Sequence, residues 1–218
     1  MASFTPPNPP ANLRLDNFYT TVTADGGPAK SCRFVVRILP ATTNGLSNPS
    51  NILNTADYAT LLQDLSYLCE QAEFPGRSFD FSDFRYYGPT FQMPYNSKYA
   101  GQTDFVFYCR TESYERQLFD DWLEYINPSN TFDFNFPDNY YAEIQVFQIT
   151  DYKDSQTEQP AAMYAWTLNQ AWPLAVNPQP VTWGDEDLLR LTVTFSYKHW
   201  SRPNRDTPPT PGIVTIST

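Results

Sequence analysis

The chain has almost none of the side chains from which catalytic and metal sites are usually built. It contains one histidine, His199, so neither a two-histidine zinc site nor a histidine-based metalloprotease can be assembled within one subunit. His199 follows a strand-like segment and precedes Trp200, which favours a surface or packing role. Neither a GxSxG turn nor a glycine-rich phosphate loop occurs. We therefore expect no enzyme activity, no catalytic residue, no cofactor and no bound metal.

Carboxylates are plentiful, but their spacing does not predict a catalytic pair. Asp80 and Asp83, Asp120 and Asp121, and residues 185–187 are close neighbours in sequence. A glycosidase needs two carboxylates that face each other across a cleft, and these usually come from different elements. Acids that lie this close in loops are generally just solvated, so a glycosidase is disfavoured.

Cysteines and long apolar runs are also scarce. The three cysteines, Cys32, Cys69 and Cys109, form no CxxC pair, which argues against a zinc site or a disulfide framework. They lie in apolar, strand-like runs, so we expect buried free thiols and a reducing cytoplasm. The start MASFTPPNPP has neither a basic region nor an apolar run, so no signal peptide is expected. No stretch approaches the ~20 apolar residues of a membrane helix.

Aromatic side chains and a net negative charge are what the sequence does provide. Aromatic residues make up 17% of the chain, with 16 Phe, 15 Tyr and 5 Trp, and the formal charge is −10. Charged residues also make up only 17%, below the ~25% that is typical. Interface cores are poor in charge and rich in Tyr, Trp and Phe, so large contact surfaces for other proteins are predicted. The net charge disfavours binding to a nucleic-acid duplex, and solubility alone is an equal explanation for it.

The order of patterns predicts one β domain over residues 30–200, between proline-rich arms at 1–29 and 201–218. Residues 40–56 resemble a loop because Pro, Gly and Asn punctuate them. In the last strand, alternate residues from Leu189 to Tyr197 are apolar, which indicates one buried face. The expected strands are 30–39, 65–74, 103–110, 140–149, 162–172 and 188–198.

One segment has helical rather than strand periodicity. In TESYERQLFDDWLEYINP, four side chains at helical spacing form one apolar face: Tyr114, Leu118, Trp122 and Ile126, with Tyr125 as an alternative to the last. The pair Asn127-Pro128 ends the helix. The sequence thus predicts one α-helix at about 113–126, flanking an antiparallel β-sandwich or barrel.

A strand-like run stops at Pro75-Gly76, and a long aromatic segment follows. Turn signals lie at 87–89 and 99–101. They predict that SFDFSDFRYY and TFQMPY, on the two sides of the first turn, pair as a hairpin. We expect this segment to leave the subunit and contact a neighbouring copy, because Tyr and Met provide large contact area. The alternative is that it folds back onto its own sheet. The residues assigned to this contact are Pro75, Gly76, Arg77, Arg85, Tyr86, Tyr87, Phe91, Met93 and Tyr95.

Taken in order, several segments resemble the tail tube proteins of contractile-tailed, T-even-like bacteriophages. CRFVVRIL is similar to the first strand of that family, and YLCEQAEFPGRS to a strand with a Pro-Gly turn. The segment through Arg85, Tyr86, Tyr87, Met93 and Pro94 resembles the family's inserted loop. FVFYCRTESYERQLFDDWLEYI is similar to its strand and tryptophan-bearing helix, and the stretch from AWTLNQAW to FSYKHW to its closing strands.

The resemblance implies a structural virion protein that forms hexameric rings, in which strands of all six subunits join into one barrel. The rings would stack into a tube through which DNA passes without specific binding, with sheath and baseplate proteins as partners and no membrane. An initiator or tail-completion protein of the same fold remains an alternative, and a carbohydrate-binding tail module is a third. The proline-rich ends, the 40–56 loop and a 150–162 insert depart from the shortest members of the family.

Overall fold

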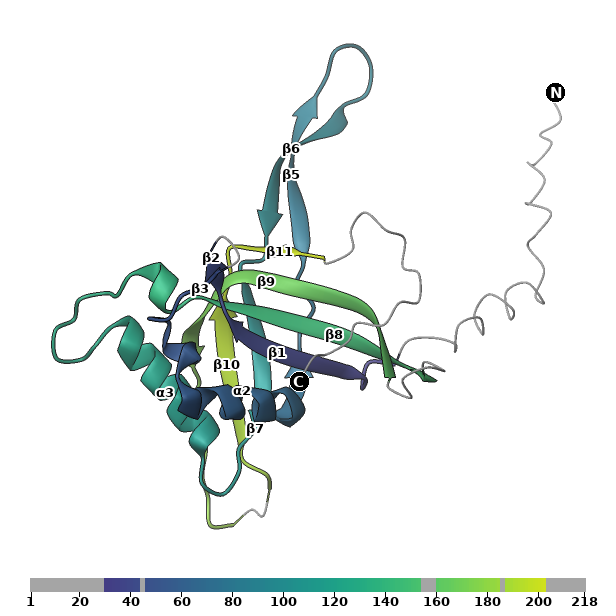
Figure 1. Ribbon diagram of the computed structural model, residues 1–218. Coiled ribbons are helices and arrows are strands. Elements are labelled where there is room, and N and C mark those ends of the chain that lie inside the picture. Colours follow the sequence, from purple (N-terminus) through teal and green to yellow (C-terminus); the bar gives the residue numbers. More distant parts are fainter. Residues whose placement is uncertain (1–29, 44–45, 154–159, 185–186, 203–218) are drawn as a thin grey trace.

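The computed structural model describes residues 30–43, 46–153, 160–184 and 187–202, and nearly all of the two terminal arms lies outside these ranges. The described chain consists mainly of antiparallel strands with two α-helices (Figure 1). The main sheet has the strand order β1-β8-β9-β10-β7-β4, and β11 pairs with β9 off this path. The predicted mainly β, antiparallel fold is therefore confirmed.

Seven strands form the main sheet: β1 (Phe34–Pro40), β4 (Cys69–Ala72), β7 (Gln102–Tyr108), β8 (Ala142–Lys153), β9 (Pro160–Val176), β10 (Arg190–Ser196) and β11 (His199–Ser201). Two further pairs stand apart from it, namely β2 (Thr42–Thr43) with β3 (Leu46–Ser47), and β5 (Arg77–Phe84) with β6 (Phe91–Tyr99). The helical elements are η2 (Ile52–Asn54), α2 (Ala56–Leu68), α3 (Tyr114–Ile126) and η3 (Pro137–Asn139).

Strand β9 changes its neighbour part-way along. It pairs with β8 as far as Ala171, opposite Ala142, and with β10 from Trp172 to Val176. Gln170 lies just before this change and has a φ of 54°. A residue in the left-handed region interrupts the pleat and redirects a strand, as a β-bulge does. The strands on both sides of the bend therefore contribute to one hydrophobic core.

Strand β10 confirms the alternation that its sequence predicts. Leu191, Val193 and Phe195 are buried in the core. Arg190 is exposed and the threonines between the buried residues are half-buried, so the opposite face is wetter. Because side chains alternate across a strand, this pattern fixes which face of β10 is covered.

Helix α3 covers the core with one face, as predicted. Leu118, Trp122 and Ile126 are buried at a spacing of four residues. The Trp122 ring centroid lies 6.1 Å from that of Phe195 in β10. The prediction is wrong for Tyr114, which is 48% exposed. Tyr114 is the first residue of α3 and lies at the edge of the apolar stripe. The buried residues of the helix are Glu115, Leu118, Phe119, Trp122 and Ile126.

The second helix, α2, corrects two expectations, the single helix and a strand over residues 65–74. It continues through Leu68, so β4 begins only at Cys69. Leu62 and Leu65 are buried in the core, and α2 contacts β1. Thr55 makes no capping hydrogen bond with its side chain. The helix is therefore stabilised mainly by tertiary packing of one face rather than by end signals.

The cysteines are all free, but they are not all buried. Cys32 is exposed in a turn before β1, which corrects the expectation of a buried strand residue there. The expected strand over residues 30–39 begins only at Phe34. Cys69 and Cys109 are half-buried beside the core.

Candidate assembly surface

The β5–β6 hairpin, called the arm below (residues 77–99), projects from the body as a separate ribbon (Figure 1). Pro75 and Gly76 separate it from β4, which belongs to the main sheet. Within the described chain, β5 and β6 pair only with each other. The arm therefore does not lie on the sheet of its own subunit.

Strand β11 and its surroundings hold the base of the arm. The Nε1 of Trp200 donates a hydrogen bond to the carbonyl of Gly76 at 3.2 Å. The rings of Trp200 and Tyr99 meet edge to face, with centroids 6.0 Å apart. The backbone N–H of Tyr197 donates to the carbonyl of Gly101, which adopts a φ of 76° in the turn after β6. These contacts fix the direction in which the arm leaves the body.

One face of the arm is aromatic and cationic. The guanidinium of Arg77 lies 5.1 Å from the ring centroid of Phe79 and 5.3 Å from that of Tyr99. Its Nε also donates to Ser97 Oγ at 2.8 Å. Phe79 and Phe81 are each 58% exposed. This face consequently presents aromatic rings and a guanidinium to whatever covers it.

The other face of the arm is polar and internally paired. The Nζ of Lys98 lies 2.8 Å from Asp80 Oδ2, and Asn96 Nδ2 donates to the same oxygen at 3.2 Å. The hydrogen bond from Lys98 lowers the pKa of the Asp80 carboxyl. Because neighbouring residues of a strand point to opposite faces, the alternation in β5 and β6 separates the two surfaces.

The tip of the arm is held in one shape while its rings face solvent. Arg85 Nε donates to the carbonyl of Gly88 at 3.0 Å, and Gly88 takes a φ of 85° that suits glycine. Tyr87 is 98% exposed, and Tyr86 is exposed as well. The hydrogen bond therefore orders the turn without covering either tyrosine.

The remaining residues that the sequence assigned to the arm lie on β6, where Phe91, Met93 and Tyr95 are all exposed. The Phe91 ring stacks on Phe84 across the hairpin, with centroids 6.4 Å apart. A two-stranded hairpin by itself is at best marginally stable in water. Exposed apolar groups on this scale mark contact sites for other molecules. The arm thus has the properties of a surface that another molecule covers.

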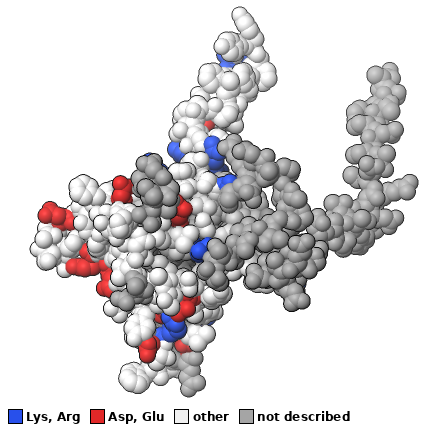
Figure 2. All heavy atoms as spheres, in the orientation of Figure 1, with Lys and Arg blue, Asp and Glu red and all other residues white. Residues whose placement is uncertain are grey.

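Charge is unevenly distributed between the arm and the body. The arm contains three basic and two acidic residues, which gives it a net charge of +1 in a chain of −10. In Figure 2, Lys and Arg atoms gather on the arm and near its base, whereas Asp and Glu atoms gather over the part of the body around α3. A partner surface of negative potential would therefore favour the arm over the body.

Two exposed aromatic segments were not found from the sequence. The first connects α3 to η3, where Phe132, Phe134 and Phe136 are 72%, 75% and 79% exposed. Its signal is the alternation FDFNF between turn residues. In Figure 1 this connection projects sideways from the body.

The second is the β9–β10 loop, which comprises residues 177–189. Val181 and Leu188 are exposed in it, and Trp183 is fully exposed. Its first residue is tied to β10, because the N–H of Asn177 donates to the carbonyl of Thr192 at 2.9 Å. Two prolines shortly before a tryptophan are the signal that could have marked this loop in the sequence.

Among the described residues, the main strand path, from β1 to β4, ends in two open strands. β1 pairs only with β8 and β4 only with β7 among the described residues, so each has one free edge. An unpaired edge presents backbone donors and acceptors to another chain. These edges are a second feature suited to assembly.

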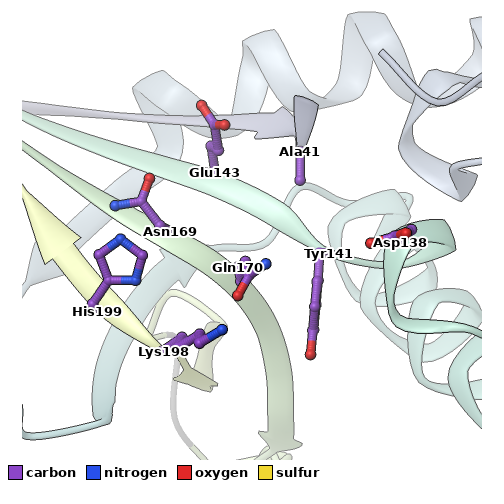
Figure 3. A pocket seen from close by; sticks show the side chains of 8 residues that line it. All are labelled: Ala41, Asp138, Tyr141, Glu143, Asn169, Gln170, Lys198 and His199. Carbon is purple, nitrogen blue, oxygen red and sulfur yellow. The ribbon is translucent and has the colours of Figure 1, made fainter. Parts of the chain in front are cut away.

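A shallow hollow of about 260 Å³ lies beside β11, and its lining comes from several elements (Figure 3). Its polar side chains include Glu143, Asn169, Lys198 and His199. Among the described residues, no group of three His, Cys, Asp or Glu side chains could hold a metal ion. No helix in the described ranges is long and apolar enough to cross a membrane.

Comparison with known proteins identifies a family and several solved structures that are similar to this chain. A family model described as phage tail tube protein matches residues 29–203. No curated protein sequence matches the chain. Solved structures share the fold at low sequence identity. A chain of the PVC sheath/tube terminator, from an extracellular contractile injection system, has a TM-score of 0.52 and 14% identity, covering 83% of this chain and 99% of that one.

Two further structures agree. A chain of the PVC sheath-tube complex in its extended state has a TM-score of 0.51 and 13% identity, covering 85% of this chain and 96% of that one. A chain of the anti-feeding prophage baseplate has a TM-score of 0.51 and 16% identity, covering 81% and 95%. At such identities these likenesses support the fold, and the family model carries the assignment.

Proposed function

The chain belongs to the phage tail tube protein family, and on that premise we propose that it is the structural subunit of a tail tube. Six copies form a ring, rings stack into a hollow tube, and DNA leaves the virion through it. The observation that carries the proposal is a family fold with a projecting aromatic arm that pairs with no other strand of the described chain. No step of this role needs a catalytic group.

Ring closure has a physical basis in the sheet. β1 and β4 lie at opposite ends of the strand path and, within the described ranges, each has a free edge. Pairing of these edges between neighbouring copies would satisfy their backbone groups and remove two edges that would otherwise be open to aggregation. A closed ring of identical contacts follows when the rotation between neighbours returns to the first copy.

The arm would make a further contact between copies, in addition to the paired strand edges. Its residues Tyr86, Tyr87, Met93 and Tyr95 would be covered by a neighbouring copy, either in the same ring or in the next one. Association would bury the aromatic face and stabilise a hairpin that is marginal on its own. In the virion, the sheath would surround the tube and a baseplate would start it.

The acidic chain suits a conduit. A net charge of −10 opposes binding of the DNA backbone, so DNA would pass without being held at each ring. The same fold also serves other positions, since the similar structures include chains from a baseplate and from a tube terminator. An initiator or tail-completion protein is therefore the second candidate, and it would need a partner to assemble. A carbohydrate-binding tail module is a weaker third candidate.

Electron microscopy of the purified chain over a concentration series tests the proposal. We expect rings at low concentration and hollow tubes at higher concentration, with six-fold symmetry in end views. Monomers that persist at all concentrations would contradict self-assembly and favour the initiator. Glycan-array binding by such monomers would favour the carbohydrate-binding module.

A further inference from the structure

The β9–β10 loop lies outside the two strand edges assigned above to ring closure, yet among the described residues it exposes the largest apolar side chain outside the arm. We propose that this loop is the docking site for the arm tip of a second copy of the chain, with Trp183 packed between Tyr86, Tyr87 and Arg85 of that copy. The inference deepens the proposed function and rests on it, because it names the two surfaces by which successive rings join.

The first argument is the chemistry of the loop. Trp183 is fully exposed, and Val181 beside it is 83% exposed. Tryptophan, tyrosine and arginine are the residues that most often dominate binding energy at interfaces. A guanidinium and two phenol rings on the tip match an indole, since arginine stacks on aromatic faces and tyrosines pack against them.

The second argument is that the loop is built to present its apex. Gln179 Nε2 donates to the carbonyl of Arg190 at 2.9 Å, and Arg116 donates to the carbonyl of Asn177 at 3.2 Å. Asp187 is held by Arg190 at 3.0 Å on the returning side. Pro178 and Pro180 restrict the backbone before the apex. Both ends of the loop are thus fixed while its apex, at Trp183, remains exposed. Fixing the ends lowers the conformational entropy that the loop loses on binding.

The third argument is the placement of the two surfaces. In Figure 1 the arm leaves one end of the molecule, and the connection between β9 and β10 lies at the opposite end, beyond β7 and β10. Two different surfaces at opposite ends give a head-to-tail contact that every copy can repeat. When the rotation between neighbours does not return to the first copy, such a contact extends a stack of rings rather than closing one ring.

The fourth argument is charge. The arm has a net charge of +1, whereas residues 177–189 contain three acids, Asp185, Glu186 and Asp187, of which Asp187 is paired with Arg190. Opposite signs on the two surfaces guide their encounter and oppose contact between two arms or between two loops. Copies would therefore add in one orientation.

The exposed phenylalanines between α3 and η3 are the competing surface. They project to the side of the body in Figure 1 rather than to the end opposite the arm. Phe134 is 75% exposed and so provides a matched control, since its replacement removes a similarly bare ring elsewhere.

The first experiment compares the full chain with its Trp183→Ala and Phe134→Ala variants by electron microscopy over a concentration series. We expect Trp183→Ala to form rings but to raise the concentration needed for tubes by at least about tenfold. Phe134→Ala should behave as the unaltered chain. Tubes of normal length at the normal concentration from Trp183→Ala would overturn the inference, and so would loss of the rings themselves. Absence of rings in the unaltered chain would instead refute the proposed function.

The second experiment tests the contact itself. Thr90 on the arm tip and Thr182 beside Trp183 are both exposed, and both are changed to cysteine in a chain that also carries Cys32→Ser. A short bis-maleimide should join assembled copies into a ladder that extends beyond six subunits on a denaturing gel. Either cysteine alone should give no ladder. Tubes of the double variant without a ladder would show that tip and loop do not meet.

Discussion

The carboxylate of Glu115 is completely buried, and its Oε1 lies 2.5 Å from Nε of Arg110. The other oxygen accepts a hydrogen bond from the backbone N–H of Arg110 at 3.2 Å. Arg110 also reaches Asp64 in α2, at 2.8 Å. The hydrogen bond to Glu115, followed by that to Asp64, raises the pKa of the Arg110 guanidinium. One arginine thus compensates a buried charge at the start of α3 and connects α3 to α2.

Replacing Arg110 with Met should destabilise the fold more than removing an exposed ion pair. The variant would leave Glu115 buried without a counterion, which is the costly way to break such a pair. We expect a melting temperature several degrees lower in calorimetry. Asp120→Asn is the control, because it removes only the exposed ion pair with Arg116 one helical turn away, which contributes little, and leaves Arg116 able to donate to the carbonyl of Asn177. Equal losses in the two variants would contradict the buried-charge argument.

Trp122 offers a second stability test. Its Nε1 donates to the carbonyl of Tyr140 at 2.9 Å, and its ring is fully buried against Phe119 and Phe195. Trp122→Phe removes this donor and leaves a small void, so we expect a loss of about 1–3 kcal/mol in the free energy of unfolding. Urea denaturation measures it. Trp183→Phe, at an exposed position, should change the unfolding free energy by less than about 0.5 kcal/mol.

The two helices show what could be predicted from sequence and what could not. α3 was predicted because Leu118, Trp122 and Ile126 form a long apolar stripe that ends before a proline. α2 also has a stripe, in which Leu62 and Leu65 are buried, but it follows a loop-like segment and runs directly into β4. Without a stop signal between helix and strand, its last turn resembles the start of the strand.

Of the exposed aromatic segments, the sequence predicted the arm but not the β9–β10 loop. The arm was found because a Pro-Gly turn signal precedes an aromatic segment with few helix formers and a Gly-Pro turn signal lies in its middle. Trp183 was missed because exposure depends on where the ends of β9 and β10 lie in three dimensions. A sequence in which 17% of residues are aromatic cannot distinguish a core ring such as Phe195 from an exposed one by composition alone.

The cysteines give a chemical test of the fold. Burial raises the pKa of the Cys69 thiol to about 12 and also raises that of Cys109. The thiolate is the reactive form, so both should be nearly inert near neutral pH. Cys32 is exposed, and we expect a maleimide to label it alone in the folded chain, as read by mass spectrometry. All three should react in denaturant, and Cys32→Ser should abolish labelling of the folded form. Rapid labelling of Cys69 in the folded protein would show that β4 opens.

Shortening the arm separates folding of the subunit from assembly. Ser78 and Lys98 are paired residues of β5 and β6, so Asn-Gly can replace residues 79–97 as a two-residue hairpin turn. The contacts of Trp200 with Gly76 and Tyr99 at the base would remain. We expect an unchanged melting temperature, because the removed side chains are largely exposed, together with loss of tubes in electron microscopy. Tubes formed normally by the shortened chain would refute a role for the arm between copies. A large fall in melting temperature would show instead that the arm stabilises its own subunit.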